Sequence, residues 1–256
     1  MWQCNSAPSA PHLVAPPGSA ILMHALPLEA AMSFLDDLKR KATELQAIRS
    51  VDHDALARST GLVEAAAQAV SRYLLDLGKQ LEVLRPVSKV SYAFDKKTRL
   101  EGMPMVDFRF DARRKRLREQ ELIDHISFSC VVRGKDAVTL RKDFVPDSKR
   151  LEARLWQSGA HCETETVRNP KTGHFVEMRY VFVPEVRLAL KIVPNHDAGM
   201  LRFTFNNLDD LETVECEFAP HEVGQTRRLD ELARWWLGEP NRFLDGASQL
   251  RRIEAR

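Results

Sequence analysis

The sequence predicts an α+β fold, with an N-terminal helical hairpin packed on a mostly antiparallel sheet, a mid-chain helix and C-terminal helices. Three observations support this prediction. Apolar residues recur at helical spacing up to Leu84, the apolar period changes to two from Val90, and strand-like segments then follow one another with only turns between them. Short turns between successive strands favour antiparallel pairing.

The first 31 residues differ in composition from the rest of the chain. They contain five of its 13 prolines, and Glu29 is their only charged side chain. At Met32 a different pattern begins, because Ser33 can cap a helix whose first turn holds Asp36 and Asp37. We therefore expect Met32 to be the natural start, with residues 1–31 a disordered or non-native N-terminal extension.

Residues 32–86 are predicted to form the helical hairpin. The first helix covers residues 33–50, and the second begins after Asp52 or Asp54, either of which can cap it, and ends before Pro86. Its apolar stripe can face the rest of the protein or a partner. The apolar residues at helical spacing are Phe34, Leu35, Leu38, Ala42, Leu45 and Ile48, followed by Leu56, Val63, Ala66, Val70, Leu74, Leu77, Leu81 and Leu84.

Residues 87–256 are predicted to form an α+β body. Its strand-like segments alternate apolar and polar residues and are separated by turn residues such as those of "NPKTG" and "NHDAG". A hairpin is expected where "RGKD" separates two of them. The segments are residues 90–94, 105–110, 122–132, 138–144, 161–167, 175–183, 185–193, 200–205 and 212–218.

Helices are expected near residues 147–158 and 228–253 of this body. The mid-chain helix has Leu151 and Leu155 on one face and Gly159 as its C-cap. The C-terminal region is predicted to hold a helix from Leu229 to Leu237 and a short helical segment from Asn241 to about Ile253.

Composition and charge limit the possible classes of protein. The chain has 256 residues and a net charge of +2, as expected for a soluble globular protein of one or two domains. Its four cysteines lie far apart without metal-binding spacing, which favours a reducing, cytoplasmic compartment. Its apolar runs fall well short of the roughly 18 residues needed to span a membrane, so no membrane partner is expected.

A basic run between two predicted strands is the candidate anion-binding site. Residues 109–118 contain six basic side chains and one acidic side chain, so the positive charge is local in a nearly neutral chain. The run can bind phosphates, or it can be a solvated strand end or a protected sheet edge. If the segment is instead a helical turn, Glu119, Glu121 and Asp124 can pair with the run. The candidate residues are Arg113, Arg114, Lys115, Arg116 and Arg118.

A candidate partner surface lies in "RWWLGEPNRF". Trp236 shares a helix face with Leu229 and Leu232, whereas Trp235 lies about 100° away from it. Trp235, with Arg234 and Arg242, can therefore form an exposed contact surface, since Trp and Arg are enriched at interaction hot spots. Alternatively, the helix predicted to follow covers Trp235 with Phe243 and Leu244.

Catalytic and cofactor signatures are absent from the sequence. No GxSxG, HExxH, GxGxxG or P-loop motif occurs, so the catalytic residues are unknown and no metal or cofactor is expected. An enzyme with a dispersed active site would instead gather several chemically capable residues in one deep pocket. Those residues are His125, His161, His174, His196, Asp197 and His221.

These observations favour a non-enzymatic cytoplasmic binding or adaptor protein that contacts a protein partner or another copy of itself. The alternatives are nucleic-acid or other polyanion binding through the basic run, and an enzyme with a sequence-dispersed active site.

Overall fold

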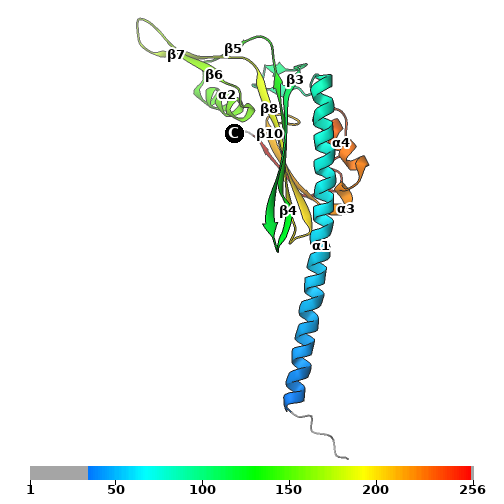
Figure 1. Ribbon diagram of the computed structural model, residues 1–256. Helices are drawn as coiled ribbons and strands as arrows, with labels where there is room; N and C mark the ends of the chain where they lie inside the picture. Colours follow the sequence, from blue (N-terminus) through cyan, green and yellow to red (C-terminus); the bar gives the residue numbers. More distant parts are fainter. Residues whose placement is uncertain (1–33, 255–256) are drawn as a thin grey trace, which may run out of the picture. The chain divides into compact units, whose positions relative to one another are not determined.

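The computed structural model describes residues 34–254, without the side chains of residues 48–51 (Figure 1). The predicted extension at residues 1–31 lies outside this range. The chain divides into two units, residues 1–49 and 50–256. Helix α1 (Phe34–Leu84) crosses this boundary. In the first unit it has i,i+3 and i,i+4 ion pairs, such as Arg40 with Asp37 at 2.6 Å.

The main element of the second unit is a six-stranded antiparallel sheet. Its strand order is β11-β10-β9-β8-β4-β3, so that β8 to β11 form a meander and the β3–β4 hairpin is added beside β8. The mostly antiparallel prediction is confirmed. The strands are β3 (Met105–Leu117), β4 (Gln120–Arg133), β8 (Glu185–Asn195), β9 (Met200–Asn206), β10 (Glu212–Phe218) and β11 (Ser248–Glu254).

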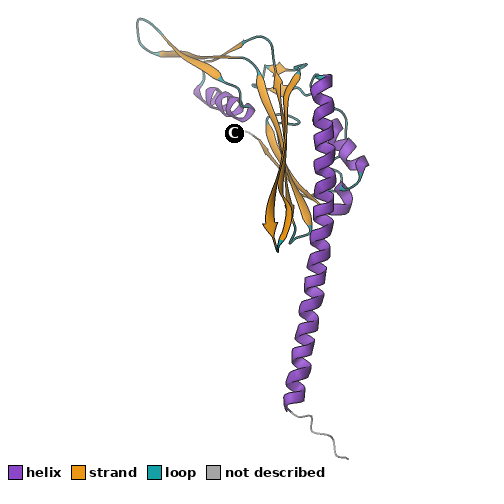
Figure 2. Cartoon of the chain, in the orientation of Figure 1, coloured by secondary structure: helices purple, strands orange, loops and turns teal. Residues whose placement is uncertain are grey.

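Two smaller sheets and three further helices complete the second unit (Figure 2). The small sheets are β5-β7-β6, made of β5 (Val138–Lys142), β6 (Cys162–Arg168) and β7 (Phe175–Phe182), and the pair β1 (Tyr92–Ala93) and β2 (Arg99–Leu100). The helices are α2 (Val145–Ser158), α3 (Pro220–Val223) and α4 (Thr226–Trp236). None of the helices in residues 34–254 is long and apolar enough to cross a membrane.

The core lies between the large sheet and the helices α1 and α4. Alternate residues of β8 are buried, as a strand with one covered face requires. From residue 50 onward, α1 covers that face with a stripe that includes Val63, Val70 and Leu74, and its Gly78 lies close to Phe128 of β4. Gly78 permits this close approach, because an added Cβ would lie 3.1 Å from the Phe128 ring.

The predicted hairpin of two N-terminal helices is a single helix. Residues 50–54, where a loop was expected, are helical, and α1 ends at Leu84, two residues before Pro86, as predicted. The sequence at residues 50–54 allows a break in the helix but does not require one. Aspartates 52 and 54 can cap a helix but can also lie within one, and the segment has neither glycine nor proline to interrupt it.

Two further predictions about the body are wrong. The segments on either side of "RGKD" do not form a hairpin, because β4 pairs with β3 and β8 whereas β5 pairs with β7 in the small sheet. The predicted helical segment from Asn241 to Ile253 instead contains β11, which pairs with β10. In both cases pairing with a strand distant in sequence overrides the local pattern.

The two buried thiols Cys130 and Cys216 predict a loss of stability at alkaline pH. Burial raises the pKa of each thiol from 9.0 to about 12. The unfolded state therefore releases these protons first, and the free energy of unfolding falls between about pH 9 and 12. The loss is at most about 1.4 kcal/mol per pH unit for each thiol. Urea unfolding over this range measures it.

The matched control for this prediction is the double variant Cys130→Ala and Cys216→Ala. It lacks both titrating groups, so its free energy of unfolding should decline less steeply with pH than that of the unmodified chain. Equal slopes for the two proteins would show that the buried thiols do not contribute.

Candidate functional site

The basic run lies on the last part of β3 and in the turn that follows. β3 continues to Leu117, so most of the run is strand, whereas the sequence suggested a strand ending near Phe110. Arg118 and Glu119 alone connect β3 to β4, and both have positive φ, at 49° and 65°. A two-residue hairpin turn with this backbone matches the twist of the strands it joins.

Three of the five basic side chains already have acidic partners. Arg113 Nε lies 3.0 Å from Asp111, and Lys115 Nζ lies 3.1 Å from Asp124. Arg118 pairs with Asp197 and also donates to Thr60 Oγ1 at 3.2 Å. Asp124 was one of the acidic residues expected to neutralise the run. These ion pairs reduce the charge available to a polyanion.

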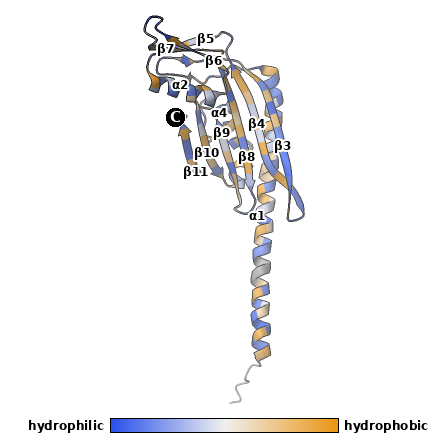
Figure 3. Ribbon diagram, turned by 90° about the vertical axis from the view of Figure 1, so that its left-hand side faces the viewer, coloured by the Kyte–Doolittle hydropathy of each residue, from blue (hydrophilic) through white to orange (hydrophobic). Residues whose placement is uncertain are grey.

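The two remaining arginines lie on the opposite face of β3 from Lys115. Arg114 lies opposite the buried Ile123 and Arg116 lies opposite Glu121, whereas Lys115 lies opposite Leu122. Within residues 34–254 neither arginine makes an ion pair. β3 is hydrophilic along much of its length (Figure 3). Its basic side chains nevertheless do not form one surface, because they are divided between the two faces of the strand.

Basic residues from elsewhere in the chain do not extend the run. Arg141 and Lys142 belong to β5, which is in the small sheet rather than beside β3. There Lys142 pairs with Asp95 at 2.5 Å, and Arg141 lies 3.9 Å from Glu177. The structure therefore does not build a wider basic patch from these residues.

A buried polar cluster lies near the β3–β4 hairpin. His196 is only 2% exposed, and its Nε2 lies 3.4 Å from Glu64 Oε2 of α1. The same carboxylate accepts the backbone N–H of Ile123 at 3.0 Å, and Gln68 donates to its other oxygen at 2.9 Å. These bonds satisfy both oxygens and join α1 to β4 and to the turn that follows β8, which indicates a structural role.

The dispersed histidines do not gather in one place. His196 and Asp197 line one hollow of about 320 Å³ and His221 lines another, while His161 and His174 are exposed. His125 pairs with the neighbouring Asp124 at 2.8 Å. Within residues 34–254 no group of three or more metal-binding side chains is found.

The structure buries Trp235, which the sequence suggested as a surface residue. Only 2% of it is exposed, since its ring packs 4.5 Å from that of Phe205 and 5.8 Å from that of Phe243. Its indole N–H donates to Asp209. Phe243 covers this tryptophan, as the alternative interpretation required, but the segment that carries Phe243 is not the predicted helix. The partner surface proposed around Trp235 lacks its anchor.

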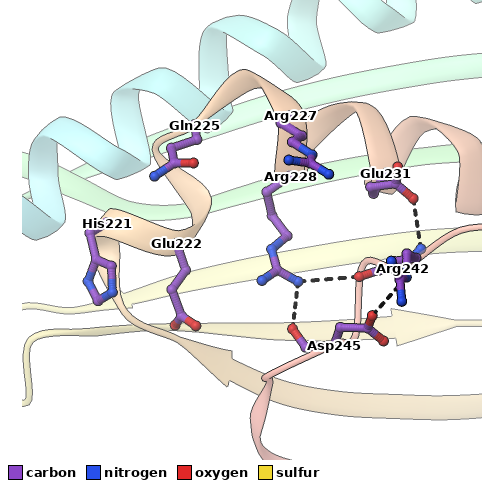
Figure 4. A pocket seen from close by; sticks show the side chains of 8 residues that line it. All are labelled: His221, Glu222, Gln225, Arg227, Arg228, Glu231, Arg242 and Asp245. Atoms are coloured by element: carbon purple, nitrogen blue, oxygen red, sulfur yellow. Dashed lines mark hydrogen bonds and ion pairs between the residues drawn. The ribbon is translucent and has the colours of Figure 1, made fainter.

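Arg234 and Arg242, the other members of that surface, are held by acidic residues. Arg234 lies 3.8 Å from Glu231, and Arg242 lies 3.2 Å from Asp245 while its backbone N–H donates to Glu231 at 2.7 Å. Arg242 lines a hollow of about 380 Å³, which we call the α3–α4 hollow (Figure 4). Its lining residues are His221, Glu222, Gln225, Arg227, Arg228, Glu231, Arg242 and Asp245.

One guanidinium nitrogen of Arg228 fixes the loop below the hollow. Arg228 Nη1 donates to the carbonyls of Phe243 at 2.6 Å, Asp245 at 2.7 Å and Arg242 at 3.3 Å. The guanidinium also lies over the ring of Phe218, 5.1 Å from its centre. The arginine is thus held in place, and among the described residues its other guanidinium nitrogens make no hydrogen bond or ion pair.

The most exposed tryptophan in the described part of the chain is on α2. Trp156 is 83% exposed, although its neighbour Leu155 is buried in the core. The two side chains are about 100° apart on the helix, so the face that buries Leu155 leaves Trp156 in solvent. The same helix geometry makes Trp156 a surface candidate from the sequence, but it also made Trp235 one, so the sequence alone does not distinguish the two.

Trp156 belongs to an exposed stripe along α2. On an ideal helix, positions 145, 149 and 156 lie within about 40° of one another around the helix axis. Val145 is 53% exposed. Phe144, the N-cap, is 60% exposed at the same end as Val145. We call the side chains of Phe144, Val145, Lys149 and Trp156 the α2 surface.

Comparison with known proteins gives no assignment. No family model, curated protein or solved structure matches this chain.

Proposed function

We propose that this chain is a non-enzymatic binding or adaptor protein that contacts a protein partner through the α2 surface. The observation that carries the proposal is the 83% exposure of Trp156 on a helix whose opposite face is buried in the core. Aromatic side chains bury about 150 to 250 Å² each at interfaces, and tryptophan is the residue most enriched at binding hot spots. An exposed Trp156 is therefore a strong anchor for a partner.

The remainder of the α2 surface supports the same role. Phe144 and Val145 add apolar area at the start of the helix, and Lys149 lies between them and Trp156. Val145 and Trp156 are separated by about 16 Å along the helix axis, at 1.5 Å per residue. Lys149 and the exposed Glu152 lie between these apolar ends, and this composition resembles the mixed composition of protein interfaces.

The α2 helix is held firmly in position, which favours binding. Leu151 and Leu155 are buried, and Arg154 contacts the backbone carbonyl of Ala93 and lies 3.7 Å from Asp210. At the end of the helix, Gly159 has φ of 82°, and its N–H donates to Leu155 O and Trp156 O at 3.2 Å. A surface already fixed loses little conformational entropy when a partner binds.

The test is affinity capture from a native lysate with tagged protein, comparing the unmodified chain with Trp156→Ser. We expect recovery of the partner to fall at least tenfold for Trp156→Ser, as for a hot-spot residue. The matched control is Val83→Ser, which changes another exposed apolar residue, on α1, and should retain the partner. Unchanged recovery with Trp156→Ser would refute the proposal.

Two additional measurements distinguish the other possibilities. Light scattering of the purified chain alone detects self-association, which Trp156→Ser should abolish if the partner is a second copy. Nuclease treatment before capture removes nucleic acid and whatever it recruits. Recovery that depends on intact nucleic acid, and not on Trp156, would favour polyanion binding instead.

A further inference from the structure

The α3–α4 hollow contains two opposite charges that are each fixed in place but do not meet. Arg228 is held through Nη1 by three carbonyls. Glu222 Oε2 accepts the backbone N–H of Ala219 at 2.8 Å. Within the described residues no ion pair joins Arg228 and Glu222. In Figure 4 the Arg228 nitrogen without a drawn bond points toward the side of the hollow where Glu222 lies.

The other charges of the hollow largely neutralise one another. Asp245 pairs with Arg242, and Glu231 accepts the backbone N–H of Arg242 and lies near Arg234. Without these groups, the charges that remain in the lining are Arg227 and Arg228 on one side and Glu222 on the other. A ligand in the hollow therefore meets positive and negative charge together.

We propose that the α3–α4 hollow binds a small zwitterion of the α-amino-acid class. Its carboxylate is held by the free nitrogens of Arg228, with Arg227 nearby, and its ammonium group by Glu222 Oε1. A plain anion would be repelled by Glu222, and a plain cation by the two arginines, whereas a zwitterion satisfies both. The volume of about 380 Å³ is within the range of small-molecule sites.

Arg228 and Glu222 are each suited to one end of the amino acid. The planar guanidinium of Arg228 can bind a carboxylate with two parallel N–H donors, which a lysine cannot do. Glu222 Oε1 has no hydrogen-bond partner among the described residues, and a Cβ added at Gly246 would lie 3.8 Å from it. His221 and Gln225 line the same side and can contact the side chain of the bound amino acid.

The test is calorimetric titration of the full chain with each of the common L-amino acids at about 5 mM. We expect at least one to bind with a Kd below about 1 mM. Its analogues that lack either the amino or the carboxyl group should bind at least tenfold more weakly. Binding by none of the amino acids would overturn the proposal.

The variant Glu222→Gln determines whether the site recognises a zwitterion or only an anion. Glutamine keeps an oxygen that can accept the Ala219 N–H, so α3 retains this bond. For a zwitterion, Glu222→Gln weakens binding of the amino acid at least tenfold. If the hollow recognises only an anion, Glu222→Gln should bind inorganic phosphate, and the analogue that lacks the amino group, as tightly as the unmodified chain or more tightly. That result would overturn the proposal.

Two further variants complete the test. Arg228→Lys keeps the positive charge but loses the paired donors, and should weaken amino-acid binding at least tenfold. Glu163→Gln is the matched control, because this exposed glutamate on β6 lies outside the lining of the hollow, and the affinity of this variant for the amino acid should stay within about twofold of the unmodified chain's. Circular dichroism and the urea midpoint confirm folding of each variant. Equal losses of affinity for Glu163→Gln and Glu222→Gln would also refute the assignment.

Discussion

Replacing Trp235 by alanine is expected to lower the free energy of unfolding by about 3 to 5 kcal/mol. The ring is buried between Phe205 and Phe243, at ring-centre distances of 4.5 and 5.8 Å, so truncation leaves a cavity in an aromatic cluster. It also leaves Asp209 without the indole N–H that it accepts. Urea unfolding followed by circular dichroism measures the loss.

The matched control is the same substitution at Trp156. Because this side chain is 83% exposed, Trp156→Ala should change the free energy of unfolding by no more than about 0.5 kcal/mol. The two variants thus separate a tryptophan that stabilises the fold from one that is available for binding. Similar losses at the two positions would contradict the burial on which both the fold and the α2 surface depend.

Replacing Asn207 is expected to have the second large effect, because this buried residue connects α2 to the large sheet. Its Nδ2 donates to Gln157 O of α2 at 3.0 Å and to Arg187 O of β8 at 2.9 Å. Its Oδ1 accepts from Gln157 Nε2 at 3.3 Å, and its carbonyl accepts from the hydroxyl of Tyr92 at 3.2 Å. Removal of its side chain leaves two carbonyls without their donor.

Two variants of Asn207 separate these bonds from the backbone requirement. Asn207 has φ of 62°, a conformation that asparagine tolerates and glycine adopts freely. Asn207→Gly loses only the side-chain bonds and should cost about 2 kcal/mol, whereas Asn207→Ala adds left-handed strain of about 1 kcal/mol. The urea midpoints give the order, and an alanine variant as stable as the glycine variant would contradict the strain argument.

The Asn207 variants also bear on the proposed function. The fixed position of α2 depends on Asn207 at one end of the helix and on Arg154 further along it. If the α2 surface binds by virtue of its rigidity, Asn207→Gly should weaken partner capture while Trp156 itself is unchanged. The α3–α4 hollow uses none of these residues, so its amino-acid binding tests an independent site.

Most strands of the body could be predicted from the sequence. The alternation of Val186, Leu188 and Leu190 indicates a strand with one buried face, and β8 shows this burial. Gly159 marks the end of α2 because a left-handed residue was required there, and the structure has it at φ of 82°. These features depend on neighbouring residues, so the local sequence is sufficient to define them.

The sequence could not determine which distant segment pairs with or packs against each strand and helix. The segment at residues 248–254 has no strong local preference, and it becomes β11 because the edge of β10 is available for pairing. The basic run does not form one continuous charged surface, for a related reason. Strand geometry sends neighbouring side chains to opposite faces, and Asp197, 79 residues away from Arg118, supplies a partner that no local pattern reveals.

The sequence by itself determined the α+β class, the antiparallel character of the sheet and most strand positions, because periodicity records which side of each element is apolar. Only the tertiary structure decided that Trp235 is buried and Trp156 exposed, since each lies beside a core position on its helix. Phe205 and Phe243 cover one of them, and no described segment covers the other. Burial depends on contacts between distant segments, and these contacts set which side chains remain free to bind.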